Sequence, residues 1–248
     1  MPLPAAVGSQ VAASMPVMNA RVEEGAGDEG RAGISSGLAG GDLRLAQLLC
    51  SRLCHDLIGA AGAISNGVEL LADKAADAAD IHDLIGLSGR QLNRRLAFYR
   101  QAFAMSGTKG AGSSIEEARR LAAAFLDGGR VALLWSDGGR LGAGDGMPAS
   151  LVRVLLCAIL VASEGLGRGG TISVRIEGAP SASTFVIDGE GRGAEVPAAV
   201  AAALDPRAAA EAITARTAPA YYLGQLVRHL NARIDLVHRD GGFCLHIA

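Results

Sequence analysis

Apolar and small residues recur in steps of three and four along the first structured part of the chain. From Asp42 onward they occupy positions 46, 50, 53, 57, 60, 64, 67/68 and 71. This alternation is typical of the heptad seam of a helical bundle. The pattern predicts a helix that begins with Asp42 as its N-cap and runs to about Asp73.

A second stripe with the same spacing follows a short polar segment, Asp73–Asp80, which we expect to be a turn. Its members are Ile81, Ile85, Ser88, Leu92, Leu96, Tyr99 and Phe103, and the segment 106–114 (SGTKGAGSS) ends it. Two long helices joined by a short loop form an antiparallel hairpin, which cannot bury such a stripe alone. We therefore expect a homodimer in which two hairpins form a four-helix bundle.

The rest of the chain alternates between helical and extended patterns. Ser114 and Glu117 have the spacing of a capping box at the start of one helix. The period-two segments 171–178 and 183–189 predict a strand hairpin. Further helices are expected at 148–164, 195–204 and 219–230, with strands at 130–135 and on both sides of a turn at 240–242. The fold class is therefore α+β, with helices on one face of a mixed sheet.

Composition narrows the functional classes. The net charge of −2 argues against a nucleic acid as the main partner. The longest uncharged apolar run, Val154–Ser163, has about half of the roughly 20 residues that cross a bilayer, so we expect no membrane association. A low cysteine count and no recognisable signal peptide predict reduced thiols in the cytoplasm.

The pattern divides the chain into parts. Residues 1–41 are rich in Gly, Ala and Ser and are expected to form a disordered tail. The hairpin occupies 42–106 and the α/β domain 114–248. Within the tail, GISSG (33–37) matches the hydrolase motif G-x-S-x-G, but it lacks the flanking strand and helix that this motif requires, so we assign it no hydrolase role.

His55 lies on the outer face of the first helix when the heptad is counted from Cys50. The same face carries Gly59, Gly62 and Asn66. One interpretation is an ordinary solvent-facing histidine. The other is a nucleophile, because a neutral imidazole offers a ring nitrogen for attack, and the carboxylate of Asp56 can orient the ring.

Glycine disfavours the helix by about 1 kcal/mol relative to alanine, so two glycines on one helix face indicate a function beyond stability. At Gly59 and Gly62 they would allow a partner helix to approach closely and bring an aspartyl phosphate to the imidazole, with Asn66 in the same contact strip. A metal site at Cys50, Cys54 and His55 is not favoured, since these side chains do not converge and no fourth ligand is evident.

The stretch LCHDLIGAAGAISNGVELL (53–71) resembles the histidine motif of the ChpT-type bacterial histidine phosphotransferases, and LAFYRQAF (96–103) and TAPAYYLGQLVRHL (217–230) are similar to later parts of that family. The resemblance spans residues 42–248. It implies a homodimer with a central four-helix bundle, a flanking domain shaped like a kinase ATPase domain, and His55 and Asp56 as the transfer histidine and its acidic neighbour. Gly59 and Ala60 stand where relatives often carry Ser-Pro.

The α/β domain departs from an ATP-binding kinase domain. Cys157 and Val161 occupy the places of the two asparagines on the kinase helix, and valine offers magnesium no oxygen ligand. In IDGEGRG (187–193), Asp188 could still meet an adenine amine, but Glu190 puts negative charge near the phosphates. TARTAPAYYLG (214–224) fills the region of the nucleotide lid. GLGRGG (165–170) matches a dinucleotide motif but follows a helix, so it is expected to be a loop.

These features predict a phosphorelay intermediate with no cofactor or metal of its own, because Mg²⁺ would be bound by the partner receiver domain. The resemblance implies that a CckA-like hybrid kinase receiver is the donor and that CtrA- and CpdR-like response regulators are the acceptors. Two alternatives remain open at this point. One is an ATP-dependent histidine kinase, and the other is a non-catalytic dimeric scaffold.

Overall fold

The computed structural model describes residues 40–73, 77–103, 114–136, 147–179 and 182–248, and Leu38–Ala248 forms one compact unit. The helices are α1 (Gly40–Asp73), α2 (Ala78–Ala102), α3 (Ile115–Leu126), α4 (Ala149–Glu164), α5 (Ala198–Leu204), the short 3₁₀ helix η1 (Ala210–Ala212) and α6 (Ala218–His229). The strands are β1 (Val131–Ser136), β2 (Gly170–Ala179), β3 (Ala182–Glu190), β4 (Ile234–Arg239) and β5 (Gly242–Ile247).

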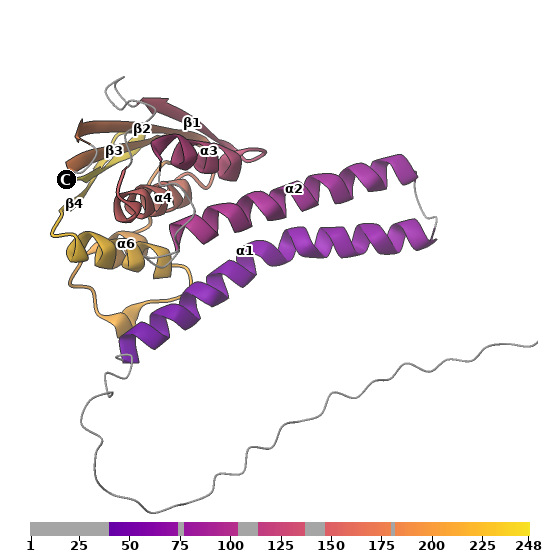
Figure 1. The fold of residues 1–248 in the computed structure, drawn as a ribbon, viewed down its shortest axis with the longest axis horizontal. Coiled ribbons are helices and arrows are strands. Elements are labelled where there is room, and N and C mark those ends of the chain that lie inside the picture. Colours follow the sequence, from indigo (N-terminus) through magenta and orange to yellow (C-terminus); the bar gives the residue numbers. More distant parts are fainter. Residues whose placement is uncertain (1–39, 74–76, 104–113, 137–146, 180–181) are drawn as a thin grey trace, which may run out of the picture. The chain divides into compact units, whose positions relative to one another are not determined.

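The predicted helical hairpin is present, with α1 and α2 side by side (Figure 1). Ala60 and Gly67 on α1 and Ile81 on α2 are buried, as the stripes predicted. The predicted start of α1 is wrong, because the helix begins at Gly40 and Asp42 lies inside its first turn. There the negative charge of Asp42 interacts favourably with the positive end of the helix dipole. The turn before α2 is shorter than expected, since Asp77 caps the helix through a bond of 2.9 Å from the amide of Ala79.

Several apolar side chains of the hairpin are exposed. Cys50 and Leu96, which the pattern placed in the stripes, are both exposed, because two helices in contact cover only one flank of each other. Further exposed apolar side chains on α1 and α2 are Leu43, Ile58, Val68, Leu70, Leu84 and Leu87.

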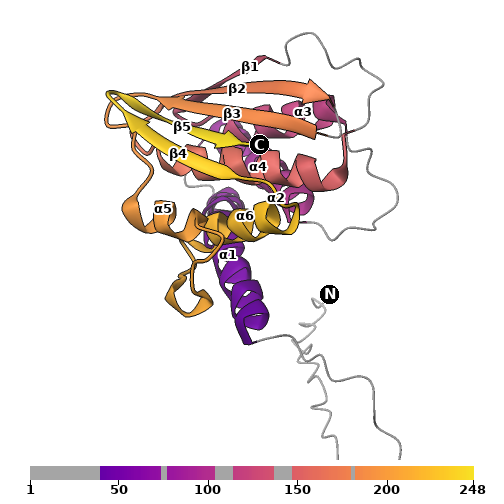
Figure 2. The same ribbon diagram turned by 90° about the vertical axis from the view of Figure 1, so that its left-hand side faces the viewer.

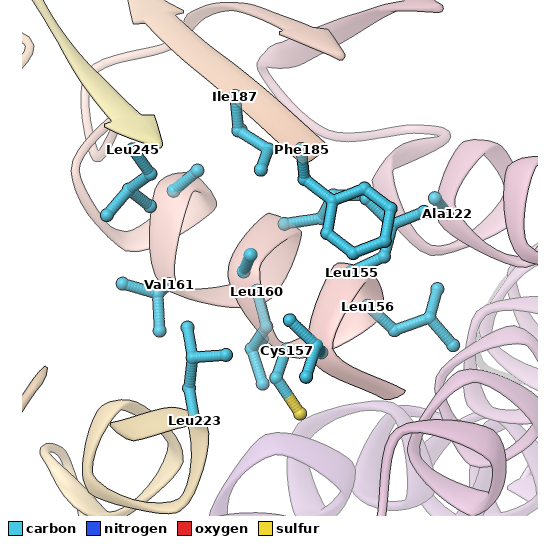
Figure 3. Close-up of a cluster of buried hydrophobic side chains, with 14 of the residues drawn as sticks. Ala122, Leu155, Leu156, Cys157, Leu160, Val161, Phe185, Ile187, Leu223 and Leu245 are labelled. Carbon is cyan, nitrogen blue, oxygen red and sulfur yellow. The ribbon is translucent and has the colours of Figure 1, made fainter. Parts of the chain in front are cut away.

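The sheet has the strand order β1-β2-β3-β5-β4. The β1–β2 pair is parallel and the other neighbours are antiparallel, so the sheet is mixed, as predicted. Helices α3, α4 and α6 lie together on one side of the sheet (Figure 2). The core lies between these layers, where the fully buried Leu155 of α4 lies close to Phe185 and Ile187 of β3 (Figure 3). These features confirm the α+β class.

The end of α2 joins the hairpin to this core. Phe98, Tyr99 and Ala102 are buried, and the ring of Phe98 stacks on Phe125 of α3 with centroids 4.1 Å apart. The thiol of Cys157 on α4 donates to the carbonyl of Ala102 at 3.5 Å. This packing holds the end of α2 against the sheet domain.

Several smaller predictions can also be compared with the structure. The Ser114 hydroxyl accepts a bond of 3.0 Å from the amide of Glu117, so the predicted helix cap is confirmed. Residues 165–169 are irregular, as expected for the GLGRGG loop. Among the described residues, no helix combines the length and the apolar character needed to cross a bilayer. The tail 1–39, which contains GISSG, and the segment 106–113 lie outside the described residues.

The two kinds of glycine on α1 should respond oppositely to alanine. A Cβ at Gly67 would lie 2.6 Å from Cγ1 of Ile85, whereas one at Gly62 would meet nothing within 4 Å. Overpacking costs about 1–3 kcal/mol and alanine gains about 1 kcal/mol over glycine in a helix. Urea denaturation should therefore show Gly67→Ala less stable and Gly62→Ala more stable than the native chain. Equal stability of the two variants would contradict this packing.

Candidate functional site

His55 lies on the outer face of α1, where the heptad count placed it, and its side chain is 84% exposed. Gly59 and Asn66 are exposed on the same helix. A Cβ built on Gly59 or Gly62 would meet nothing within 4 Å, so the surface beside the imidazole is free of side-chain bulk. The structure thus brings together His55 and the predicted contact strip of Gly59, Gly62 and Asn66.

Asp56 is the centre of a hydrogen-bonded network rather than a simple neighbour of the histidine. Its side chain is only 10% exposed. Its Oδ2 accepts a bond of 2.8 Å from Nε of Arg52 and one of 2.6 Å from the hydroxyl of Tyr99 on α2. Its Oδ1 lies 3.3 Å from Nδ1 of His55. Arg95 of α2 also donates to the Asp56 carbonyl oxygen at 2.9 Å.

This network determines the protonation of the carboxyl group. Burial by itself raises the pKa of Asp56, but hydrogen bonds from Arg52, Tyr99 and His55 and the charge of Arg52 bring this pKa below its ordinary value. Burial and the bond to Asp56 raise the pKa of the Tyr99 hydroxyl, which keeps it a donor. An ionised carboxylate only accepts hydrogen bonds, so the contact with Asp56 favours the neutral tautomer of His55 that has its proton on Nδ1 and its lone pair on Nε2.

The sheet domain contributes a second carboxylate. Glu164, at the end of α4, has Oε1 3.2 Å from a terminal nitrogen of Arg52. The pair is within ion-pair distance, but Oε1 is buried and has no hydrogen-bond partner among the described residues. Burial raises the pKa of Glu164, against the opposing charges of Arg52 and Arg216. A cavity of about 450 Å³ opens here, lined by Ser51, Arg52, His55, Asp56, Glu164, Ala215 and Arg216.

Sequence reasoning missed four of the residues around His55. Arg52 stands four residues before Asp56, a spacing at which oppositely charged side chains meet on a helix, so a local signal was present. Tyr99 was recognised only as part of an apolar stripe. Glu164 and Arg216 are distant along the chain, and no local pattern connects them with His55.

The residues compared above with an ATP-binding site lie in a different environment. Val161 is completely buried in the apolar core, beside Leu223 and Leu245 (Figure 3). Asp188 follows Ile187 on β3, so its side chain points to the opposite face of the sheet. Its carboxylate forms ion pairs with Arg175 and Arg239 and is therefore not free to bind a nucleotide.

The cysteines do not form a metal site in the part of the chain that the structure describes. Cys50 and Cys54 are exposed on α1, whereas Cys157 is buried in the core. No group of three or more His, Cys, Asp or Glu side chains among the described residues has the arrangement of a metal site.

Comparison with known proteins gives consistent matches. The model of the family described as histidine phosphotransferase C-terminal domain matches residues 115–242. The chain is 34% identical over 194 residues to the protein phosphotransferase ChpT of Brucella abortus (strain 2308), which covers 78% of this chain and 90% of the relative. A solved structure of a bacterial phosphotransferase is similar with a TM-score of 0.73 and 31% identity, over 86% of this chain and 98% of that chain.

Tyr99→Phe should lower the free energy of unfolding by about 1.5–3 kcal/mol at neutral pH, because the buried Asp56 carboxylate loses a donor. The pKa of Asp56 is lower in the folded state. Its contribution is therefore present above the ordinary carboxyl pKa and is lost as pH falls through the folded-state pKa. Urea denaturation should show the difference between native chain and variant narrowing in acid.

Tyr221→Phe is the matched control for this substitution. Tyr221 lies on α6 and is partly buried, and no hydrogen bond of its hydroxyl is recorded among the described residues. A Tyr99→Phe variant as stable as the control at neutral pH, or a difference that did not change with pH, would contradict the network at Asp56.

Proposed function

Because this chain belongs to the ChpT-type histidine phosphotransferases and acts in a phosphorelay, we propose that His55 carries the phosphoryl group between the aspartates of two receiver domains. One observation carries the assignment to this residue. The ring is 84% exposed, while the buried, ionised Asp56 lies 3.3 Å from its Nδ1. An exposed imidazole held in a single tautomer is a ready nucleophile.

The transfer follows from that arrangement. The lone pair on Nε2 of His55 attacks the phosphorus of a receiver aspartyl phosphate in line. A P–N bond forms, the P–O bond breaks, and its electron pair leaves with the receiver carboxylate. The ring becomes positively charged and keeps its Nδ1 proton, which Asp56 stabilises. The reverse of these steps passes the group to a second receiver, whose bound Mg²⁺ stabilises the developing charge, so the chain needs no cofactor or metal of its own.

Gly59, Gly62 and Asn66 form the docking strip in this proposal. The open space above both glycines supports it, since a receiver helix can approach the α1 backbone there without displacing side chains. The donor would be the receiver domain of a CckA-like hybrid kinase, and the acceptors would be CtrA- and CpdR-like response regulators. Family membership supports this class of partner, and the reaction would then take place in the cytoplasm with these regulators.

A homodimer is part of the same proposal. The exposed apolar side chains of the hairpin support it, because Leu87 and Ile58 are 60% and 70% exposed in the single chain. Packing these side chains against a second copy would build a four-helix bundle.

The two other functions considered for this chain are not favoured. An ATP-dependent kinase needs a polar nucleotide site, but the buried Val161 lies among apolar side chains and Asp188 is paired with two arginines. A non-catalytic scaffold would not require an oriented histidine. It would therefore not explain the carboxylate of Asp56 beside His55, or the bonds from Tyr99 and Arg52 that keep this carboxylate ionised.

Replacing His55 tests the proposed function directly. A receiver domain carrying a labelled aspartyl phosphate should transfer its label to the native chain, whereas His55→Ala should accept none. His82→Ala is the matched control, since His82 is an exposed histidine on α2 and is not among the residues that line the His55 cavity. Label accepted equally by native chain and His55→Ala would refute the assignment.

The nucleotide prediction has its own measurement. Isothermal titration of the chain with Mg-ATP should give no heat of binding at protein concentrations where an intact kinase domain saturates. Incubation with labelled ATP should also leave His55 unlabelled. Saturable binding accompanied by self-labelling would favour the kinase alternative.

A further inference from the structure

The Thr214–Thr217 turn carries Arg216 to the cavity that contains His55. One side-chain bond and one backbone bond close the turn. The amide of Thr214 donates to the hydroxyl of Thr217 at 3.0 Å, and the amide of Thr217 donates to the Thr214 carbonyl at 3.1 Å. Ala215 and Arg216 are its central residues, and both line the cavity. These bonds stabilise the backbone turn that presents Arg216.

Arg44 fixes the preceding segment to the first part of α1. Its guanidinium donates to the carbonyl oxygens of Ala210, Glu211 and Ile213 at 3.2, 3.4 and 3.1 Å. Arg44 and His55 are about three helical turns apart at 3.6 residues per turn, so they lie on the same face of α1. The segment from η1 to Arg216 is thus anchored on the helix face from which His55 projects (Figure 2).

The charges around the cavity leave Arg216 as the cation suited to bind an anion. Arg52 is committed, because it contacts both Asp56 and Glu164. Arg216 is exposed, and no hydrogen bond or ion pair of its guanidinium is recorded among the described residues. Before transfer, the two arginines balance the two carboxylates. A phosphoryl group on His55 adds about two negative charges beside Asp56 and Glu164. A further positively charged hydrogen-bond donor would stabilise these charges.

We propose that Arg216 binds the phosphoryl oxygens on His55 and so holds the phosphohistidine between the two transfers. The inference rests on the proposed function, since it assigns a ligand to the same cavity. The planar guanidinium can donate two parallel hydrogen bonds to phosphoryl oxygens, a geometry for which arginine is better suited than lysine. Glu164 lines the same cavity, so its carboxylate attracts the guanidinium of Arg216 toward it.

This assignment gives the TARTAPAYYLG segment a role. In place of a nucleotide lid, the chain has a short turn that presents an arginine to the transfer histidine. No bond to Arg216 forms or breaks during the reaction. The P–N bond forms at Nε2 of His55, and Arg216 donates hydrogen bonds to the phosphoryl oxygens while that bond forms and after it has formed.

The test uses phosphoramidate, a small compound that phosphorylates imidazole as its own P–N bond breaks and ammonia leaves. No receiver takes part, so docking contacts do not affect the rate. Labelling of His55 should be about tenfold slower in Arg216→Ala than in the native chain, which is the loss expected for one charge-assisted hydrogen bond. The rate should be partly restored in Arg216→Lys, because lysine keeps the charge but not the planar pair of donors. Arg207→Ala is the matched control, since Arg207 is exposed on the preceding loop and does not line the cavity.

A second readout comes from the phosphorylated protein itself. The ³¹P resonance of phospho-His55 should shift in Arg216→Ala and remain unchanged in Arg207→Ala, because only Arg216 contacts the phosphoryl oxygens. Circular dichroism should show both variants folded, since both side chains are exposed.

The outcomes separate this inference from the proposed function. Equal labelling rates for native chain and Arg216→Ala would overturn the role of Arg216. So would a defect seen only with a phosphorylated receiver, because Arg216 would then be a docking contact. In both cases the proposed function would stand, provided that the native chain is labelled and His55→Ala is not. Failure of the native chain to accept label from a receiver would instead refute the proposed function.

Discussion

Two hydrogen bonds to a single oxygen of Asp56, from Arg52 and Tyr99, determine the chemistry of the His55 site. A buried carboxyl group without such donors would take up a proton, because burial disfavours its charge. With Oδ2 held by two donors, Asp56 remains ionised and its Oδ1 remains available to the imidazole. The free ring nitrogen of His55 therefore depends on its contact with Asp56 and on two further hydrogen bonds in which His55 takes no part.

Those contacts link the site to the packing of the whole unit. Tyr99 is both a donor to Asp56 and part of the aromatic group that buries the end of α2 against α3, with Phe98 stacked on Phe125. Arg52 connects α1 to Glu164 at the end of α4. The sheet domain therefore takes part in the geometry of His55 through its core and through one carboxylate, and this role needs no nucleotide.

Local periodicity was enough to predict most elements and the direction of His55, because both depend on the spacing of apolar residues within one helix or strand. Periodicity alone does not identify helix caps, because Asp42 and Asp77 are both residues that favour an N-cap and only Asp77 caps a helix. The ion pair of Asp188 with Arg239 was not predictable, because Arg239 lies 51 residues further along the chain on β4, a strand that does not pair with β3. Arg216 was missed for the same physical reason, since a turn between two helices has no period that indicates which cavity it faces.

The anchoring of one segment by Arg44, and the position of His55 on the same helix, impose a condition on the length of α1. Each residue added to a helix turns everything beyond it by about 100° and moves it by about 1.5 Å. A single insertion between Arg44 and His55 would carry the imidazole away from the face that Arg216 shares, even if every side chain were kept. The number of residues in this stretch of α1 is therefore under tighter constraint than the identity of its exposed side chains.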